Sequence, residues 1–275
     1  MKNKHSFLLK GNNNIGVLLL HGWTSPPEEF LPLAKYLNSF GYTVSAPLLR
    51  GHGTKPEDLL GVKWEDWLED SRKALEELKK TLSLTTAVVR NDADEDLTRG
   101  QNGMSVARDE TKIFVGGISM GGNLSMMLSG DDSVAGILAM GPSVKFRFHK
   151  LDKLVIAFMG LTKVYRKKYY PPWVRKKMGK RDVYMYYPVE SAKEVMKLAD
   201  ETRKYLPAVI KPILIMQSTS DHMVSKRSPQ IIADGVKSKI KEIFWIENAY
   251  HVFAEKKEVW EKIGEFIKKI LSAKS

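Results

Sequence analysis

Short apolar runs alternate with amphipathic stretches along most of this chain, and that alternation limits the folds open to it. The apolar runs are short enough to be strands, and they lie at 16–20, 42–46, 113–116, 134–140, 212–217 and 240–246. The amphipathic stretches carry apolar residues at helical spacing, and they cover 27–40, 64–82, 119–128 and 259–271. Strands that alternate with helices predict an α/β protein with a mostly parallel sheet and helices on both faces.

The segment Gly117-Ile-Ser-Met-Gly121 lies between a predicted strand and a predicted helix. A strand-to-helix turn this tight leaves no room for side chains at the two flanking positions, which accounts for a glycine at each. The Ser119 hydroxyl would then lie above the sheet edge at a helix N-terminus, where the helix dipole favours negative charge. The pattern predicts that Ser119 is a nucleophile; the alternative is a glycine-rich helix start with Ser119 as its N-cap.

A serine nucleophile needs a general base and an acid that orients the base, and both are expected later in the chain. Asp221 follows the run at 212–217, and His251 follows the run at 240–246. Both therefore lie at the sheet edge that carries Ser119, where open α/β sheets bind their ligands. We predict that His251 takes the Ser119 proton and that Asp221 fixes the His251 tautomer. The alternatives are His21 or His222 as the base, and Asp200 or Glu247 as the acid.

The segment His21-Gly-Trp23 follows the run at 16–20 and predicts part of an oxyanion hole. A tight turn there can aim the backbone N–H of Trp23 at a substrate oxygen, and the second donor would be the backbone N–H of Met120. His21 itself is interpreted as structural, with its ring hydrogen-bonded to the loop.

Two stretches interrupt the alternation and are interpreted as insertions into a core formed by residues 1–144 and 207–275. The first, 83–110, is polar and rich in Asp and Gly. A compact domain seldom holds so long a loop, so we expect a surface insertion in which 86–90 pairs with 104–108 as a hairpin.

The second insertion, 145–206, is predicted to form a cap over the sheet. Within it, residues 145–190 carry 13 Lys and Arg against three acidic residues, together with ten aromatic residues. The apolar run Leu154–Met159 is too short to span a bilayer and is interpreted as the underside of the cap, facing an acyl group. The predicted substrate-binding residues are Phe158, Met159 and Val224.

Five segments occur in a known order and spacing: His21-Gly-Trp-Thr, Arg50-Gly-His-Gly53, Gly117-Ile-Ser-Met-Gly-Gly122, Ser220-Asp-His-Met-Val224 and His251. With the helix segment Trp64-Glu-Asp-Trp67, they resemble the carboxylesterase and monoacylglycerol lipase branch of the α/β-hydrolases. The resemblance implies the α/β-hydrolase fold, with a core sheet of up to eight strands and a cap. It departs from the branch in the insertion 83–110, in the basic cap, and at Ala249, where the branch often has Ser.

The resemblance also implies a serine hydrolase that cleaves short- to medium-chain acyl esters or monoacylglycerols through an acyl-Ser119 intermediate. It implies no cofactor, and no metal site is expected, because Asp92–Asp96 lacks the glycine and the glutamate of a calcium loop. A thioesterase, amidase or acyltransferase with the same three residues stays open.

The formal net charge of +12 bears on partners and location. The basic cap predicts contact with an anionic membrane in preference to nucleic acid. Two alternatives stay open: the cations form only a solvated face, or the protein is a binding protein on a hydrolase scaffold. The absence of cysteine and of a secretion signal favours a cytoplasmic location.

Overall fold

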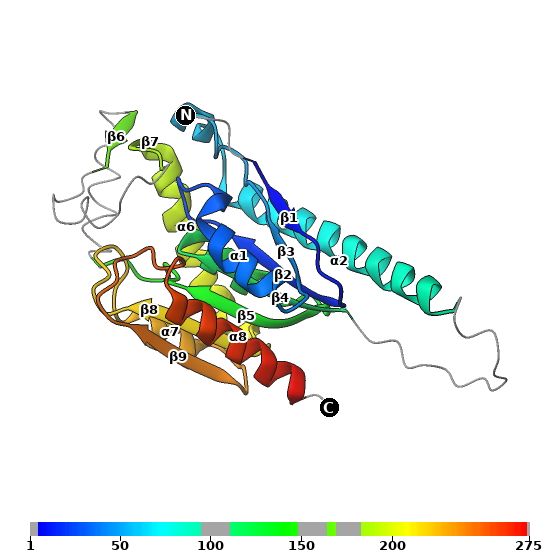
Figure 1. Cartoon of the computed structure of the whole chain (residues 1–275). Helices are drawn as coiled ribbons and strands as arrows, with labels where there is room; N and C mark the ends of the chain where they lie inside the picture. The colour runs from blue at the N-terminus through cyan, green and yellow to red at the C-terminus, as the bar shows by residue number, and fades with distance from the viewer. Residues whose placement is uncertain (1–4, 95–110, 148–163, 169–182, 274–275) are drawn as a thin grey trace.

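The computed structural model describes residues 5–94, 111–147, 164–168 and 183–273. One sheet contains β1 (Phe7–Leu9), β2 (Ile15–Leu20), β3 (Thr43–Ala46), β4 (Lys112–Ile118), β5 (Val134–Met140), β8 (Ile213–Ser218) and β9 (Lys241–Ile246). Its seven strands run in the order β1-β3-β2-β4-β5-β8-β9 (Figure 1). Every pairing is parallel except that of β1 with β3, so the predicted, mostly parallel α/β sheet is confirmed.

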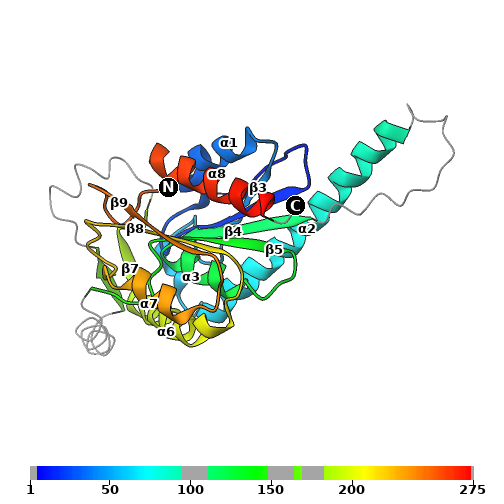
Figure 2. The ribbon, with the colours of Figure 1, turned by 90° about the horizontal axis from the view of Figure 1, so that it is seen from below.

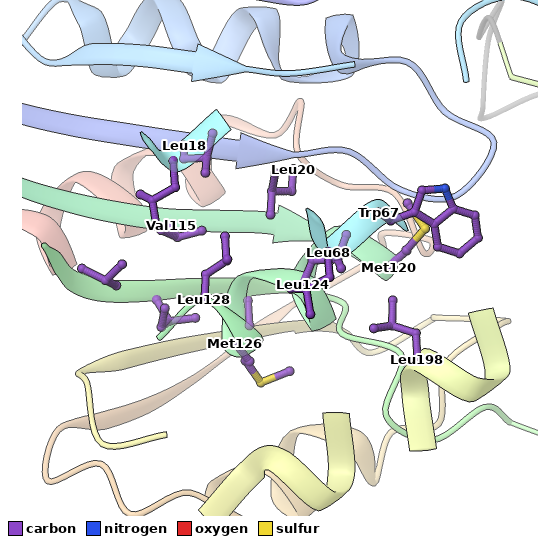
Figure 3. Close-up of a cluster of buried hydrophobic side chains, with 14 of the residues drawn as sticks. Leu18, Leu20, Trp67, Leu68, Val115, Met120, Leu124, Met126, Leu128 and Leu198 are labelled. Carbon is purple, nitrogen blue, oxygen red and sulfur yellow. The ribbon is translucent and has the colours of Figure 1, made fainter. Parts of the chain in front are cut away.

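Helices cover both faces of this sheet (Figure 2). One face carries α1 (Leu31–Asn38) and α8 (Lys257–Ser272), which bury Val17 and Leu19 of β2. The other face carries α2 (Trp64–Asp94), α3 (Met120–Met127), α6 (Val189–Tyr205) and α7 (Ser228–Gly235), which bury Leu18 and Leu20 (Figure 3). Successive residues of a strand point to opposite faces, so a continuous apolar run such as β2 supplies both cores. Short 3-10 turns complete the chain: η1 (Pro27–Phe30), η2 (Pro56–Leu59) and η3 (Leu206–Ala208).

The strand order places a topological switch point between β2 and β4. The chain leaves β2 through α1 to reach β3 on one side, and β4 lies on the other side of β2. The two strands run in parallel, and Leu20 at the end of β2 pairs with Gly117 near the end of β4. The loops that follow these two strands therefore start side by side, which is where open α/β sheets bind ligands.

Helix α2 is longer than the sequence pattern predicts. It begins at Trp64 as expected but continues to Asp94, and its last turns project beyond the sheet (Figures 1 and 2). The predicted strand at 86–90 is therefore wrong. No Gly or Pro interrupts residues 64–94, so nothing in the backbone ends the helix earlier. The proposed pairing partner, 104–108, lies outside the described residues.

Two parts of the predicted cap are described. Strands β6 (Tyr165–Lys167) and β7 (Tyr186–Pro188) form a two-stranded antiparallel sheet. Helix α6 packs against α3, and its Val195 and Leu198 join the buried cluster beneath the sheet. Phe158 and Met159 lie outside the described residues. Among the described helices, none combines the length and the hydropathy needed to cross a bilayer.

Candidate active site

Ser119 lies on the turn between β4 and α3 with φ 55° and ψ −113°, a conformation that non-glycine residues seldom adopt. A Cβ atom added at Gly117 would lie 2.4 Å from the Gly121 carbonyl group. One added at Gly121 would lie 1.8 Å from the Leu20 carbonyl oxygen, inside the core of the sheet. The two glycines are therefore required by close backbone approach, as the sequence pattern predicts.

His251 and Asp221 come from the loops after β9 and β8, and their side chains are in contact. The Asp221 Oδ2 atom lies 2.8 Å from His251 Nδ1, and it also accepts a hydrogen bond from Gln217 Nε2 at 2.8 Å. The Oδ1 atom accepts hydrogen bonds from the backbone N–H groups of Met223 and Val224, both at 2.8 Å. These contacts fix the plane of the carboxylate and, through it, the orientation of the imidazole ring.

Asp221 is buried, yet its environment favours the charged form. Burial alone would raise the pKa of the carboxyl group, but the neighbouring His251 ring and the hydrogen bonds outweigh it. The pKa of Asp221 is therefore lowered from its ordinary value, and the group is a carboxylate at neutral pH.

The other candidate acids lie elsewhere. Glu247 is exposed and accepts a hydrogen bond from Thr219 Oγ1 at 2.9 Å. Asp200 lies on α6, where it pairs with Arg203 one turn away. Among the contacts of the described residues, the carboxylate on the His251 ring is that of Asp221.

The other candidate bases have different surroundings. His21 is fully buried: its Nδ1–H donates to the Gly22 carbonyl oxygen at 3.0 Å, and its Nε2 accepts the Leu49 N–H at 3.1 Å. Burial lowers the pKa of His21 to about 4, and the predicted hydrogen bonding of this ring to the loop is confirmed. His222 lies edge-on to Tyr250, with ring centroids 6.1 Å apart.

The motif at 50–53 is held by helix α2. The Arg50 guanidinium binds Asp66 and Glu69 at 3.0 Å each and Asp70 at 2.6 Å. The Trp67 indole N–H donates to the Arg50 carbonyl oxygen at 3.2 Å. This network fixes the loop after β3, so two of the motifs that carry the family resemblance have a structural role here.

A cavity of about 520 Å³ opens beside Ser119 and His251. Trp23 also lines it, and an added Cβ at the adjacent Gly22 would lie 3.8 Å from Ser119 Cβ. Apolar side chains form much of the wall, and those from the described residues include Ile118, Phe146, Tyr187, Val195, Met196 and Met223.

Two predicted site residues in the described part of the chain, Met120 and Val224, do not line this cavity. Met120 begins α3, so its backbone N–H has no carbonyl partner one helical turn earlier, while its side chain is buried near Trp67 (Figure 3). Val224 is buried and supports Asp221 through its backbone; in the described part of the chain, Met223 lines the cavity and Val224 does not. The residue that lines the cavity is therefore one position earlier than predicted. The hydrogen bonds from the backbone of Met223 and Val224 to Asp221 fix the direction of this loop.

Tyr187 and Lys168 line the cavity but are not predicted from the sequence. Tyr187 packs edge-on against Trp23 with ring centroids 4.6 Å apart, and Lys168 lies 5.6 Å from the centroid of the same ring. Both come from the β6–β7 hairpin, and no local pattern relates this hairpin to the loop after β2. The described residues include no cluster of three or more His, Cys, Asp or Glu side chains arranged to hold a metal ion.

The chain is similar to known proteins in sequence and in fold. Residues 91–257 match the family model described as serine aminopeptidase S33. The chain is 30% identical over 246 residues to a thermostable monoacylglycerol lipase of Bacillus sp. (strain H-257), covering 88% of this chain and 84% of the relative. It is 26% identical over 268 residues to a carboxylesterase of Bacillus subtilis (strain 168), covering 96% of each.

Among solved structures, one from work on the metagenome-derived lipolytic enzymes LipS and LipT superposes with a TM-score of 0.77. It is 26% identical in sequence, and the match covers 98% of this chain and 99% of that one. The fold, the family model and the relatives agree, and this chain belongs to the serine aminopeptidase S33 family of α/β-hydrolases, in the branch of the carboxylesterases and monoacylglycerol lipases.

Proposed function

We propose that this protein hydrolyses carboxylic esters of short- to medium-chain acyl groups, including monoacylglycerols, through an acyl-Ser119 intermediate. The observation that carries the proposal is the 2.8 Å contact of His251 Nδ1 with the buried Asp221 carboxylate, on a ring that shares a cavity with Ser119. The names of the Bacillus relatives support the ester and monoacylglycerol substrates.

In the proposed reaction, His251 Nε2 accepts the Ser119 hydroxyl proton as the serine oxygen attacks the ester carbonyl carbon. The backbone N–H groups of Trp23 and Met120 stabilise the negative oxygen of the tetrahedral intermediate. The intermediate collapses, His251 gives its proton to the departing alcohol oxygen, and an acyl-Ser119 ester is left. Water then attacks this ester with His251 again as the base, which releases the carboxylic acid and regenerates Ser119.

The direct test is Ser119→Ala, which should lower kcat by about 10⁴-fold or more while leaving the circular dichroism spectrum unchanged. A serine-directed phosphonate should add one equivalent of mass, and peptide mapping should place it on Ser119. Labelling at another residue, or near-normal turnover by the variant, would refute the assignment.

The same three residues could act on thioesters or amides, or transfer the acyl group to an alcohol. A panel of matched butyryl ester, thioester and amide separates the hydrolytic activities, and added alcohol detects transfer. Esters with two to sixteen acyl carbons, together with monoacylglycerols, give the chain-length preference. A bounded cavity should produce an optimum chain length, whereas a steady rise with length would argue against a bounded acyl site.

We also propose that residues 145–206 act as a cap whose basic residues contact an anionic membrane, and that the protein is cytoplasmic. The charge of 145–190 supports the first idea, and the absence of cysteine supports the second. In the described part of the cap, Val164 and Tyr186 are exposed. Val164 lies just before β6, and Tyr186 pairs with the exposed Lys167 across β6 and β7.

A further inference from the structure

One wall of the catalytic cavity is charged. Lys168 and Arg166, from the β6–β7 hairpin, line it together with Glu29 from η1. These residues share a cavity with Ser119, so a substrate that reaches the serine also meets their charges. The hydrolysis of a neutral ester does not require this wall.

Lys168 reaches from the hairpin to the loop after β2. Its backbone N–H donates to the Met185 carbonyl oxygen at 2.8 Å, which extends the hairpin pairing. Its ammonium donates to the Thr24 hydroxyl and lies 5.6 Å from the Trp23 ring centroid. An ammonium group has three N–H donors, and the Thr24 hydroxyl accepts one of them. The cation is thus fixed beside the loop that carries the Trp23 N–H.

The described residues supply little negative charge to this ammonium. Among the described residues, its charged and titratable neighbours are Glu29 from η1 and His52 from the loop after β3, and Arg166 from β6 lines the same cavity. Glu29 Oε1 already accepts the Gly22 N–H at 3.0 Å. Burial lowers the pKa of Lys168 to about 7 even though Glu29 opposes the shift.

The other titratable groups described near Lys168 do not neutralise its positive charge. His52 is buried; burial, the nearby His21 and the Lys168 charge together lower its pKa, so it stays neutral. Arg147, Lys256 and the carboxylate of Glu255 also line the cavity. Lys256 pairs with Glu258 at 3.1 Å. Cations thus outnumber carboxylates in the described wall, and a partly buried cation with too little opposing charge is stabilised by a bound anion.

We propose that this cavity binds an anionic group, a carboxylate or phosphate carried by the ester substrate, with Lys168 as its main partner and Arg166 beside it. The inference rests on the proposed ester hydrolysis and adds a substrate class to it. Preferred substrates would be esters that carry a negative charge on the acyl or the alcohol part.

The test uses matched ester pairs that differ in one charge. On the acyl side, the 4-nitrophenyl monoester of adipic acid is compared with 4-nitrophenyl hexanoate. On the alcohol side, the butyrate ester of 4-hydroxybenzoate is compared with that of 4-hydroxybenzamide. The readout is the ratio of kcat/KM for the anionic ester to that for the neutral ester, because effects on the shared catalytic residues cancel in this ratio.

In at least one arm the wild-type ratio should be highest near pH 6 and should fall about tenfold by pH 8.5, because Lys168 loses its proton in this range. Lys168→Met should lower the ratio at pH 6 about tenfold and make it independent of pH. Lys168→Arg should keep a high ratio at every pH, since guanidinium stays protonated. Lys167→Met, a change at an exposed neighbour, is the control for net charge and should behave as wild type.

A ratio that is the same in wild type and Lys168→Met in both arms would overturn the inference. So would a wild-type preference for the neutral ester at pH 6 in both arms. Failure of the proposed function gives a different result: neutral esters would then not be hydrolysed, or Ser119→Ala would retain activity. Activity on neutral esters without a charge preference removes only the anion subsite.

Discussion

Asp221 owes its proposed role to contacts that no other described carboxylate makes. It is buried, its two oxygens accept hydrogen bonds from Gln217, Met223 and Val224, and it contacts the His251 Nδ1 atom. An amide in its place could keep the geometry but would present an N–H or a weaker acceptor to the ring. The ring would then favour the tautomer that cannot accept the serine proton.

Asp221→Asn should therefore lower kcat by about 10⁴-fold, with KM little changed. The matched changes Glu247→Gln and Asp200→Asn should alter kcat by less than about threefold, because neither group contacts His251. Steady-state kinetics on one neutral ester decides the matter. Equal losses in all three variants would mean that Asp221 does not orient the base.

His21 gives the fold a dependence on pH. Its pKa is lowered to about 4 by burial, below the ordinary value of 6.5. As pH falls, the unfolded chain therefore takes up the proton before the folded protein does. The stability that neutral His21 provides is fully present above pH 6.5 and is lost as pH falls towards 4.

The free energy of unfolding should thus drop by about 2 kcal/mol between pH 7 and pH 5 on account of His21 alone. The buried His52, whose pKa is also lowered, should add to this slope. Urea titrations at pH 5, 6 and 7 measure it. His21→Gln should be less stable at pH 7 but should show a shallower slope, whereas His5→Gln, at an exposed position, should keep the wild-type slope. An unchanged slope in His21→Gln would contradict this account.

The predicted catalytic side chains lie shortly after the ends of strands. Ser119, Asp221 and His251 each occupy a position set by the end of a parallel strand, so a local pattern suffices to bring them to one edge. Lys168 and Tyr187 reach the cavity through tertiary packing of the hairpin on the loop after β2. That packing depends on segments more than a hundred residues apart, which no local pattern encodes.

Helices and strands can be predicted from the sequence where their apolar residues form a continuous run or recur at regular spacing. The sequence predicts strands β2, β5, β8 and β9 to within a residue or two, since each contains a run of apolar residues. Strand β1 (Phe7–Leu9) has three residues and an exposed side chain at Leu8, too little for a recognisable pattern. The sequence pattern does not predict the end of α2, because the polar composition of 83–110 is typical of a loop, although polarity does not stop a helix.

The turn between β4 and α3 depends on contact with β2 as much as on its own residues. A methyl group at 121 would overlap the Leu20 carbonyl oxygen, and neither backbone segment can move without breaking the pairing of β2 with β4. Gly130, just after α3, is exposed and serves as a comparison. A Cβ atom added there would lie 3.1 Å from the Tyr205 hydroxyl oxygen, at the end of a side chain.

Gly121→Ala should therefore destabilise the protein by about 2 kcal/mol or more and lower kcat by at least tenfold, because the Met120 N–H would shift with the turn. Gly130→Ala should change both by little. Urea unfolding and ester kinetics on the two variants test this. Normal stability and activity in Gly121→Ala would contradict this account. It would mean that position 121 and the Leu20 carbonyl oxygen are farther apart than the 1.8 Å distance to an added Cβ implies.

The segments that form the sheet and its helices are not the segments that carry most of the net positive charge. The sheet and its two layers of helices are built from segments of ordinary composition, while the stretch 145–190 carries most of the net charge of +12. In the proposed cap these cations are gathered in one stretch of the sequence, between β5 and α6. They can act together on an external surface of opposite charge.

A membrane-docking role makes a quantitative prediction. Each cation near an anionic bilayer contributes about 1 kcal/mol, and the attraction decays over about 10 Å at 0.1 M salt. Wild type should therefore sediment with phosphatidylserine-containing vesicles at low salt and be released at high salt. Neutral phosphatidylcholine vesicles and duplex DNA at equal ionic strength serve as comparisons, because nucleic acid would give a similar salt dependence.

Two variants test whether the position of the positive charge matters. Each replaces four basic residues, one set in the cap and the other on α1 and α8. One changes Lys167, Arg175, Lys176 and Lys177 of the cap to Gln and leaves the cavity residues Arg166 and Lys168 intact. The other changes the exposed Lys35, Lys257, Lys268 and Lys269 of α1 and α8. Loss of vesicle binding only in the cap variant is expected, since the attraction depends on which cations lie within a Debye length of the bilayer. Equal loss in both would mean that net charge alone attracts the protein, and absence of binding by wild type at low salt would exclude membrane docking by the cap.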